Sequence, residues 1–529
     1  MNPASYNYPV LSCEASLALE KEILPDEAAE WAAMRKAGEG VAEALVCDYR
    51  ELRQVPERLR VLALLAKGNN SGDALIACSQ LLADFPRAEI TLLRVSEPED
   101  MRPLARQAYE RIAGRVKELP VASDADSEAI LQQMHKCSEG RGFDIVIDGL
   151  LGMTFRPPVR EPIRSVIEAV NAYEAIGLRA AIDVPSGKGD DSDNHFFRAD
   201  FSYATGVVKK VLLSDQVDCG RVRFVDLGFF RTEAGSAIRG ESFFLQQDSL
   251  RALRRLRPAS ADKRAYGHLF IVGGSTRMPG ALMMTVQAAV RSGVGLVTVF
   301  APASVVSKLA AHVPEAMWRP WPEMPNGTLN PRAMGDLLRH LDRATAVIVG
   351  PGMGQGRNTE AIAQKIVQTA SMPVLLDADA LRLRVVELVA KRKSSFGPVV
   401  ITPHAGEFLR LTWETSTAIH EERLLAFCRN YQTIAVLKGP FTRICNGEAV
   451  FYNPFGGPVL SRGGSGDLLA GLIGGLLAQS STDAQTAAAQ GVALHGMAAE
   501  LLARERGQVT VHTTQLLDYL SEALRGADC

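Results

Sequence analysis

Short, wholly apolar runs alternate along the chain with longer segments whose apolar residues recur at helical spacing. In the first half the apolar runs include VLALLA (61–66), FDIVID (143–148) and RAAID (179–183). Segments such as NTEAIAQKIVQTA lie between runs of this kind and have the spacing of an amphipathic helix. Strands without alternating polar residues are buried on both faces, which is typical of a parallel sheet covered by helices on each side. The pattern therefore predicts an α/β fold.

The second half carries a longer series of the same kind of strand. These strands are predicted at 268–273, 295–300, 346–350, 373–377, 399–402 and 434–438. The last strand of the first half is predicted at 222–229, and a polar segment follows it. The basic stretch at 251–265 lacks interleaved aromatic residues, which favours a solvated helix and linker over a nucleic-acid contact. We therefore predict two α/β domains, 1–240 and 241–529.

Composition narrows the class of protein. The 529 residues are 47% hydrophobic and 22% charged, and the net charge of −2 gives no general attraction for nucleic acid or an anionic membrane. The eight cysteines show neither CxxC nor zinc spacing and are interpreted as free thiols. No signal peptide is predicted, and the longest apolar run, 468–478, is too short and glycine-rich to span a bilayer. A soluble cytoplasmic protein is predicted.

Five strands of the second half end directly in a glycine-rich or acidic segment. In chain order these segments read IVGGSTRMPGA, GPGMGQG, DADAL, TPHAGE and KGPFT. In open parallel sheets, ligands bind outside the carboxyl ends of the strands. Each segment alone is interpreted as a tight turn, whereas five of them on one edge predict a site for an elongated ligand or for two ligands.

The segment SRGGSGDLLAGL (461–472) places an acid, Asp467, directly after a glycine-rich loop. It is neither a Walker A loop nor GxGxxG. The residues alone leave two interpretations open: a helix cap with Asp467 in the first turn, or an anion hole made by Gly463, Gly464, Ser465 and Gly466. Two like charges about 4 Å apart repel by roughly 4 kcal/mol at an effective dielectric of 20, and a helix terminus returns only about 0.3–2 kcal/mol. Beside a phosphate, Asp467 therefore fits a base that takes the proton of an attacking hydroxyl.

The order and spacing of these motifs, together with the stretch YGHLFIVGGSTRMPGALMMTVQAAVRSGVGLVTVF, resemble one known family. They are similar to the ribokinase-like domain of ADP/ATP-dependent NAD(P)H-hydrate dehydratases over roughly 260–520. The resemblance implies that hydrated NADH or NADPH is phosphorylated on the hydroxyl of its saturated ring and then loses phosphate. It implies Mg²⁺ beside the nucleotide. A two-domain chain resembles the branch that uses ADP, with ATP as the alternative donor.

The resemblance also implies roles for particular residues. Asp467 would be the base toward the hydrate hydroxyl, and the hydrate would also contact Ala281, Gly354 and His404. The nucleotide would contact Lys438, Gly439, Pro440, Phe441, Thr442 and Gly466. Asp377 and Asp379 are candidate helpers of Mg²⁺, with strand-end caps as the alternative interpretation. Arg382 departs from the family, which often has Asn after DADAL.

The first half has its own set of polar strand ends. The stretch VLALLAKGNNSGDALIACSQLL (61–82) is interpreted as strand, loop and helix. Asp148 follows a second strand, and Asp183 and Ser186 follow a third. Carboxylate, amide and hydroxyl oxygens suit a hard cation and a polar ligand, whereas an Asn-rich turn is the alternative for the loop. The polar loop residues are Asn69, Asn70, Ser71, Gly72 and Asp73.

The order GNN…GD, D…LLG and D…PSG resembles the NAD(P)H-hydrate epimerase domain over roughly 10–235. The resemblance implies a Rossmann-like three-layer α/β/α domain that binds the hydrate and a potassium ion. The ion would be held by Asn70, Asp148 and Ser186. The hydrate would contact Asn69, Asn70, Ser71, Gly72, Asp73, Gly152, Met153, Thr154 and Asp183. Asp183 is the candidate for acid–base work between the R and S hydrates.

Some residues of the first half depart from the family or have a second interpretation. Ser71 and Ala74 stand where the family has glycines, and MTFRPP replaces a glycine-rich turn. Each replaced glycine removes room for backbone approach or freedom for a positive φ. Lys209 is a candidate for a family lysine, with a solvated lysine as the default interpretation.

The leading hypothesis is a bifunctional enzyme of nicotinamide-nucleotide repair, both lyase and isomerase. Its implied substrates are the hydrates NADHX and NADPHX and the donor ADP, and the family suggests a homo-oligomer without nucleic-acid or membrane partners. The alternative is a small-molecule kinase, acting on a vitamin precursor or a sugar, with a non-catalytic nucleotide-binding N-terminal module.

Overall fold

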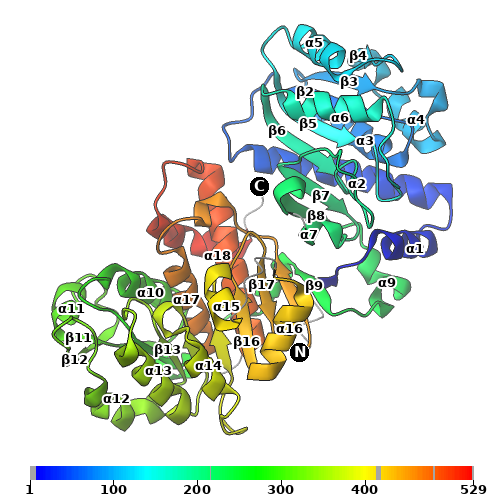
Figure 1. The fold of residues 1–529 in the computed structure, drawn as a ribbon. Helices are drawn as coiled ribbons and strands as arrows, with labels where there is room; N and C mark the ends of the chain where they lie inside the picture. Colours follow the sequence, from blue (N-terminus) through cyan, green and yellow to red (C-terminus); the bar gives the residue numbers. More distant parts are fainter. Residues whose placement is uncertain (1–6, 215, 413–418, 480–482, 527–529) are drawn as a thin grey trace. The chain divides into compact units, whose positions relative to one another are not determined.

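The computed structural model describes residues 7–214, 216–412, 419–479 and 483–526. The chain forms two compact units, which divide between residues 240 and 241 (Figure 1). Each unit is built around a sheet flanked by helices. The α/β class predicted from the apolar runs is confirmed.

The first unit contains a seven-stranded sheet in the order β4-β3-β2-β5-β6-β7-β8, and all its strands are parallel. The strands are β2 (Arg60–Leu65), β3 (Glu89–Arg94), β4 (Lys117–Pro120), β5 (Phe143–Gly149), β6 (Ile176–Ile182), β7 (Phe201–Thr205) and β8 (Arg221–Val225). The chain begins this sheet at β2, adds β3 and β4 on one side, and then returns to add β5 on the other. The switch point therefore lies between β2 and β5, where doubly wound sheets bind ligands.

Alternate residues of β2 pack against helices on opposite faces of this sheet. Val61, Ala63 and Leu65 belong to one apolar cluster, and Leu62 and Leu64 belong to another. The first cluster includes residues of α2 (Glu27–Tyr49), α3 (Asn69–Asp84) and α4 (Pro103–Glu110). The second includes residues of α5 (Ser127–Cys137) and α6 (Ile163–Ala172). Burial on both faces explains the unbroken apolar sequence of β2, and the layers are those of a Rossmann-like domain.

The sheet of the second unit runs from β9 to β12 in the order β9-β18-β17-β16-β15-β14-β13-β10-β11-β12. Its strands are β9 (Ser242–Leu245), β10 (His268–Val272), β11 (Leu296–Pro302), β12 (Met317–Trp321), β13 (Ala346–Val349), β14 (Val374–Leu376), β15 (Val399–Ile401), β16 (Thr433–Leu437), β17 (Thr442–Cys445) and β18 (Val450–Asn453). The strands from β16 to β12 are parallel, and β17 is antiparallel to both neighbours. The switch point lies between β10 and β13.

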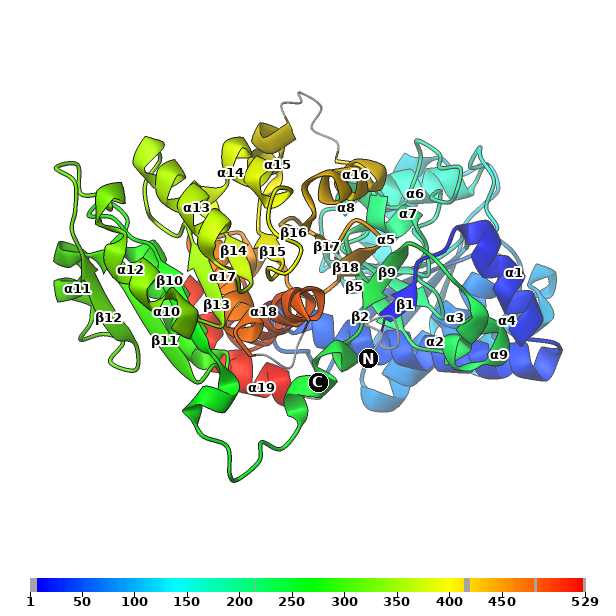
Figure 2. The same cartoon turned by 90° about the horizontal axis from the view of Figure 1, so that it is seen from below.

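Helices cover both faces of the second sheet (Figure 2). One face carries α10 (Pro279–Arg291), α17 (Ser465–Leu477) and α18 (Ala484–Arg506), and the other carries α13 (Arg357–Thr369), α14 (Leu383–Val389), α15 (Ala405–Thr412) and α16 (Glu421–Tyr431). Glycines of α17 allow close packing. A Cβ atom on Gly471 would lie 2.2 Å from the carbonyl oxygen of Thr285 on α10, and one on Gly474 would lie 2.3 Å from Ile348 Cδ1 on β13. The glycine-rich run thus fixes α17, and with it the helix start that carries Asp467.

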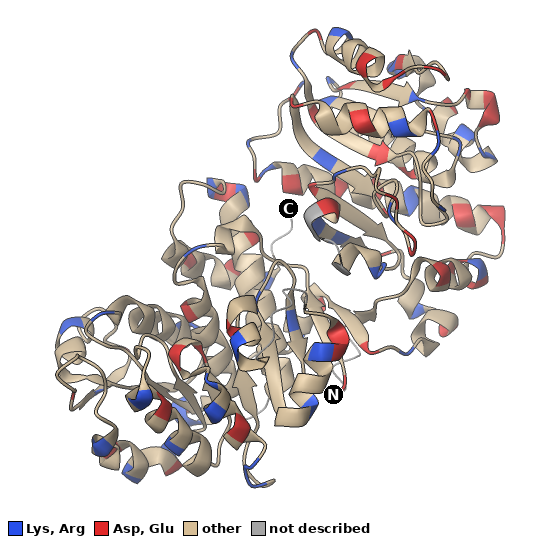
Figure 3. Ribbon diagram, in the orientation of Figure 1, with Lys and Arg blue, Asp and Glu red and all other residues tan. Residues whose placement is uncertain are grey.

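Three expectations drawn from composition can be compared with the structure. Among the described residues, Cys13, Cys78, Cys137, Cys219, Cys428 and Cys445 are free thiols. Within the described part of the chain, no helix combines the length and the apolar character that crossing a membrane requires. Figure 3 shows both signs of charge mixed over helices and loops of each unit, in keeping with the small net charge.

Candidate active sites

Asn70, Asp148 and Ser186 come from three neighbouring strand ends of the first unit and meet around the backbone of Leu151. Ser186 donates to both carboxylate oxygens of Asp148, from Oγ to Oδ1 at 2.6 Å and from its backbone N–H to Oδ2 at 2.8 Å. Asn70 Nδ2 donates to the carbonyl of Leu151 at 2.9 Å, and the Leu151 N–H donates to Ser186 Oγ at 2.9 Å. The structure thus brings together the three residues that were predicted to hold a cation.

The environment of Asp148 suits a cation. The residue is fully buried, and burial raises the pKa of its carboxyl to about 6, against the hydrogen bonds from Ser186 and Leu150, which lower it. These donors are neutral groups, and a buried carboxylate is costly unless a positive charge compensates it. The amide, hydroxyl and carbonyl oxygens around it are hard ligands of the kind that an alkali cation accepts.

The polar stretch 69–73 forms the first turn of α3, so the predicted loop is wrong. Asn and Ser favour turns, but they also favour helix starts, and α3 begins at Asn69. The hydroxyl of Ser71 accepts from the Ala66 N–H and donates to the Gly149 carbonyl, both at 2.8 Å. Ser71 is therefore fully buried and ties α3 to the ends of β2 and β5. Neither Ser71 nor Ala74 has a positive φ. The backbone at these two positions therefore adopts a conformation that does not require glycine.

Asp183 contacts a lysine for which the default sequence interpretation was solvation. Lys209 is fully buried, and its ammonium group donates to Asp183 Oδ1 and, at 3.2 Å, to the Thr205 carbonyl. Thr205 Oγ1 donates to the same Asp183 oxygen at 3.3 Å. The solvated interpretation of Lys209 is therefore wrong, because the segment after β7 turns it inward to an acid. Asp183 has a φ of +64°, a left-handed conformation that non-glycine residues often hold at functional sites.

A cavity of about 340 Å³ opens in the first unit beside these groups. Asn69, Asp73, Thr205 and Glu20 of α1 (Cys13–Ile23) are among the residues that line it. Burial, with the charges of Asp183 and Glu20, holds the pKa of the Asp73 carboxyl well above its usual value. Two predicted hydrate contacts therefore face the cavity, and Glu20 joins them although its sequence context, an ordinary helix, carries no signal of function.

The remaining predicted hydrate contacts of the first unit lie around Asn70. A Cβ atom on Gly152 would be 3.6 Å from Asn70 Cβ, and Met153 and Thr154 continue the same loop. Gly72 is buried against α2, since a Cβ atom there would lie 2.5 Å from Met34 Sδ.

In the second unit, Asp467 lies in the first turn of α17, which begins at Ser465 after Gly464 in a left-handed conformation with a φ of +91°. The first turn of a helix presents unpaired N–H groups and a partial positive charge, which suits an anion. The Gly463 carbonyl accepts from Thr513 Oγ1 at 2.9 Å, which fixes the loop before the helix. The geometry therefore contains both features that the sequence left as alternatives, a helix start with an acid in its first turn and an exposed glycine loop.

Asp467 is surrounded by other charged groups. The pKa of its carboxyl is raised to about 7, chiefly by burial and then by Asp377, with Asp379 and Glu407 adding to the shift and Lys438 opposing it. A carboxyl with this pKa exchanges a proton near neutral pH, as a general base must.

Lys438 joins these acids at the end of β16. Its Nζ donates to Asp377 Oδ1 at 3.2 Å and lies 4.0 Å from Glu407 Oε2. Burial disfavours the charged lysine, but Asp377 and Glu407 raise the pKa of its ammonium group. A Cβ atom on Gly466 would lie 3.1 Å from Lys438 Nζ, so the ammonium group also abuts the start of α17. The other predicted nucleotide contacts, Gly439, Pro440, Phe441 and Thr442, continue from Lys438 into β17.

His404, a predicted hydrate contact, also caps α15. Its backbone N–H donates to Glu407 Oε2 at 2.9 Å, and the Glu407 N–H donates to His404 Nδ1 at 3.2 Å. This reciprocal pair is a capping box, in which Nδ1 is an acceptor. The imidazole remains 55% exposed, so its other edge can still meet a ligand. Glu407 was not predicted from the sequence, although its spacing of three residues from His404 in TPHAGE was the available signal.

Ala281 and Gly354 lie beside the switch point between β10 and β13. Ala281 is in the first turn of α10, and a Cβ atom on Gly352 would lie 3.2 Å from Ala281 Cβ. The Gly354 N–H donates to Asp379 Oδ2 at 2.8 Å. Burial raises the pKa of Asp379, and Arg382 opposes this shift. The ends of β10, β13, β14, β15 and β16 thus form one edge that carries the predicted residues.

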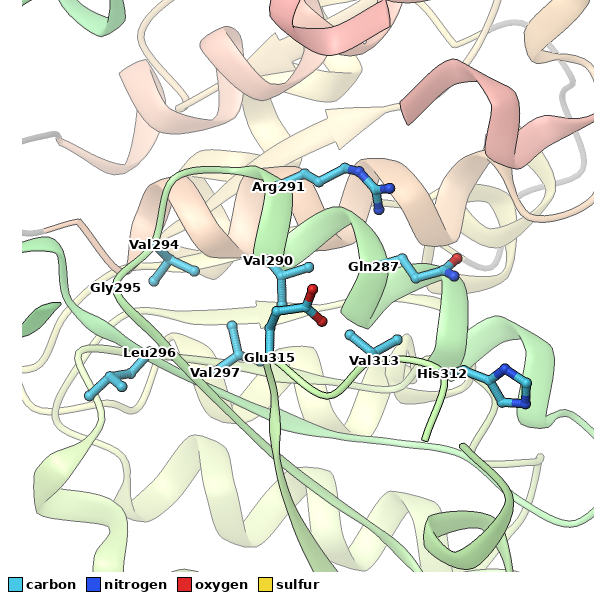
Figure 4. A pocket seen from close by; sticks show the side chains of 10 residues that line it. All are labelled: Gln287, Val290, Arg291, Val294, Gly295, Leu296, Val297, His312, Val313 and Glu315. Carbon is cyan, nitrogen blue, oxygen red and sulfur yellow. The ribbon is translucent and has the colours of Figure 1, made fainter. Parts of the chain in front are cut away.

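A second cavity, of about 390 Å³, lies at the amino-terminal end of β11 (Figure 4). Gln287 and Arg291 of α10 line it together with Leu296, His312 and Glu315. In a parallel sheet this edge is opposite to the carboxyl ends of the strands. The predicted site residues of the second unit are absent from the described lining of this cavity, so it is distinct from the site of Asp467.

Comparison with known proteins gives two family matches, one in each unit. Residues 269–522 match a family described as NAD(P)H-hydrate dehydratase, and residues 31–211 match the YjeF-related protein N-terminus.

Curated relatives match nearly the whole chain. The bifunctional NAD(P)H-hydrate repair enzyme Nnr of Moorella thermoacetica is 31% identical, over 94% of this chain and 92% of that protein. The enzyme of the same name from Gloeobacter violaceus is 32% identical, over 93% of this chain and 94% of that protein. Among solved structures, the ADP/ATP-dependent NAD(P)H-hydrate dehydratase of Bacillus subtilis, co-crystallised with ATP/Mg²⁺, is 30% identical with a TM-score of 0.46; it covers 53% of this chain and 97% of that chain.

Proposed function

Because the chain belongs to the family of bifunctional NAD(P)H-hydrate repair enzymes, we propose that its two units repair hydrated NADH and NADPH together. Residues 241–529 act as a ribokinase-like NAD(P)H-hydrate dehydratase and residues 1–240 as an epimerase of the R and S hydrates. The observation that carries this proposal is the Asp467 carboxyl, whose pKa of about 7 lets it exchange a proton at the start of α17, beside the glycine loop.

In the dehydratase step Asp467 takes the proton of the hydrate hydroxyl as that oxygen attacks the terminal phosphorus of ADP. AMP leaves, and the N–H groups from Gly463 to Gly466 stabilise the charge on the transferring phosphoryl group. The C–O bond of the phosphate ester then breaks, the neighbouring ring carbon loses a proton to the departing phosphate, and the ring double bond of NADH or NADPH is restored. Ala281, Gly354 and His404 hold the hydrate, and the segment 438–442 holds the nucleotide.

Mg²⁺ fits the acids beside Asp467. Asp377 and Asp379 provide carboxylate oxygens near the phosphate position. The negative charge of each raises the pKa of Asp467. They would hold the ion together with the phosphates of ADP. Bound there, Mg²⁺ neutralises phosphate charge. The ammonium group of Lys438 adds a fixed positive charge between Asp377 and the start of α17.

In the epimerase unit a potassium ion fits Asn70, Asp148 and Ser186, since the buried Asp148 charge meets only neutral partners in the contacts described above. The ion would anchor the hydrated dinucleotide at the switch point of the sheet. Asp183 accepts a hydrogen bond from the buried ammonium group of Lys209, and it is the candidate proton acceptor of this unit.

The decisive test supplies the S hydrate of NADPH with Mg²⁺ and either ADP or ATP. We expect the absorbance of the reduced nicotinamide to return and ADP to serve as donor, with AMP and phosphate as products. Asp467→Asn should lower the turnover number about 10²- to 10⁴-fold, as expected for a lost general base, with nucleotide affinity little changed. Turnover retained in this variant would refute the role of Asp467, and no return of absorbance in the wild type would refute the dehydratase function.

The assembly is also proposed from the family. We expect a homo-oligomer in the cytoplasm, and sedimentation of the full chain measures its mass directly.

A further inference from the structure

The first helix of the chain is fixed to the loops that carry Asp183 and Lys209. On the strand side, the Leu11 N–H donates to the Val208 carbonyl at 3.1 Å, and the Lys210 N–H donates to the Leu11 carbonyl at 2.7 Å. At the helix start, the N–H groups of Cys13 and Glu14 donate to Asp190 Oδ1 and Oδ2 at 2.8 and 2.9 Å. The position of α1 is therefore set by the backbone on both sides of the Asp183–Lys209 pair.

This placement brings Glu20, two turns into α1, to the wall of the cavity. Glu20 lines it together with Asn69 and Asp73, which were predicted to contact the hydrate, and with Thr205, which hydrogen-bonds Asp183. The side chain of Glu20 is partly buried. Asp73 thus lines the cavity from the first turn of α3, Asp183 contacts the lining residue Thr205, and Glu20 lines the cavity from α1.

The charges that face Glu20 come from several elements. The pKa of its carboxyl is raised to about 7, chiefly by burial, with Lys209 opposing the shift and Asp183 and Glu30 adding to it. Asp73, Lys21 and Arg102 are the other charged residues of the described cavity lining. Near neutral pH, Glu20 therefore exists both with and without its proton.

The other two acids of the site are less suited to give up a proton. Asp183 is in direct contact with the buried ammonium group of Lys209. Burial and two neighbouring acids keep the pKa of the Asp73 carboxyl well above its usual value. A reaction that adds one proton to the substrate and removes another needs both a proton donor and a proton acceptor. Glu20 is the acid that lines the cavity and exchanges its proton readily near neutral pH.

We propose that Glu20 is the proton donor of the epimerase reaction and that Asp183 is its acceptor, an inference that rests on the proposed epimerase function. The hydrate hydroxyl is on a ring carbon next to the ring nitrogen. Glu20 protonates this hydroxyl, the C–O bond breaks, and water leaves while the nitrogen lone pair forms a C=N⁺ bond. Water adds to the opposite face of that carbon, and its proton passes to Asp183. Solvent then reprotonates Glu20 and takes the proton from Asp183, so that the net change is inversion at one carbon.

The test uses the full chain, because its second unit reports independently on folding and on substrate quality. Purified R hydrate of NADPH is supplied, and conversion to the S form is followed by chromatography without nucleotide. Production of NADPH from S hydrate with ADP and Mg²⁺ is measured in parallel. Glu20→Gln should lower R-to-S conversion by about 100-fold or more, the usual scale for a lost general acid, and leave the S-hydrate reaction unchanged.

Two further variants separate proton transfer from a structural role. Glu22→Gln lies on the same helix at an exposed position outside the described cavity lining, and it should retain wild-type epimerisation. Glu20→Asp keeps a carboxyl group and should recover most of the activity, with the loss of rate above about pH 7 preserved, whereas Glu20→Gln should lack that pH dependence.

The outcomes are distinguishable. If Glu20→Gln epimerises within about threefold of wild type, or if the glutamine and aspartate variants fall equally with an unaltered pH profile, Glu20 is not the proton donor. If the wild type itself does not convert the R hydrate, the proposed epimerase function fails.

Discussion

Asp467 has a carboxyl whose proton affinity is set by its neighbours more than by its own chemistry. Its sequence position, first turn of a helix after glycines, would by itself favour the ionised form, because the helix start is partially positive. Burial and the acids Asp377, Asp379 and Glu407 act in the opposite direction, and Lys438 offsets them only in part. The net result is a carboxylate that is reactive toward protons, which an isolated acid at a helix start would not be.

The pH dependence of the dehydratase should follow this carboxyl. The base must be ionised, so we expect kcat/KM for the S hydrate to fall about tenfold per pH unit below a pKa of about 7. The contribution of this carboxyl to the free energy of unfolding changes with pH in the opposite direction to the rate. The folded-state pKa is raised, so the folded protein holds this proton more tightly, and its contribution to stability declines as pH rises between about 4 and 7. A rate that stays flat from about pH 5.5 to 8 would contradict the assignment.

Lys209 should matter for stability as well as for chemistry. Its side chain is fully buried and paired with Asp183, so Lys209→Met would leave a buried carboxylate without its cation. Removal of one partner from a buried ion pair costs about 3–5 kcal/mol. Urea unfolding of the full chain, followed by hydrogen exchange in peptides of β6 and β7, measures this loss.

Two further variants test whether loss of the Lys209–Asp183 ion pair causes the destabilisation. Lys136→Met, at an exposed position of α5, should change the unfolding free energy little. Adding Asp183→Asn to Lys209→Met should recover part of the loss, since no unpaired charge remains. Equal destabilisation by the two lysine variants would contradict this account.

At the scale of elements, the turn before α17 is more demanding than its sequence suggests. Gly464 has a φ of +91°, and a Cβ atom there would lie 2.3 Å from Met284 Sδ. Gly464→Ala should therefore lower the free energy of unfolding by at least the 1–2 kcal/mol or so that a left-handed residue with a Cβ costs. Gly463→Ala is the matched control for stability, because its Cβ would have no atom within 4 Å. Thermal unfolding of both variants tests this, and equal midpoints would show that the turn tolerates a side chain.

Strands such as β2, β5 and β13 could be predicted from sequence because burial on both faces leaves an unbroken apolar run, whereas β3, β4, β7 and β12 of the same parallel sheets were not predicted. The apolar runs at 61–66 and 143–148 correspond closely to β2 and β5. The strands β17 and β18 were not predicted, because each is only four residues long and carries polar residues such as Arg443 and Asn453. The start of α3 was misassigned since Asn and Ser favour both turns and helix starts.

The candidate sites could be predicted where residues follow strands and could not where a helix supplies them from elsewhere. Asp148 and Ser186 follow neighbouring parallel strands, so their meeting was predictable from strand order alone. Glu20 reaches its cavity through α1, whose first N–H groups donate to the carboxylate of Asp190, a residue about 180 positions away. Lys209 was misjudged because an isolated lysine in a sequence is exposed by default.

At the scale of the whole molecule, the two units have the same kind of architecture and carry their candidate residues at the same edge of the sheet. Each is an α/β sheet with one switch point, between β2 and β5 in the first unit and between β10 and β13 in the second. The epimerase candidates lie along the carboxyl ends of β2, β5 and β6, and the dehydratase candidates along those of β10 and of β13 to β16. A dehydratase that accepts only the S hydrate converts all of a mixture only if another activity inverts the R form, which gives a physical reason for joining the two units in one chain.

A mixture of equal amounts of R and S hydrate should therefore separate the two activities in the intact chain. With ADP and Mg²⁺, the wild type should convert the whole mixture to NADPH at a rate limited by its slower unit. Asp183→Asn should give a fast phase that stops near half conversion, because the S form is consumed and the R form then inverts only at its uncatalysed rate. Asp467→Asn should give no NADPH but should still equilibrate purified R hydrate with the S form. Chromatography of the two hydrates alongside NADPH absorbance measures each outcome.

Two results would contradict this division of labour between the units. Full conversion by Asp183→Asn at the wild-type rate would mean that inversion of the R hydrate does not depend on Asp183. Loss of both activities in Asp467→Asn would mean that the two units are not chemically independent.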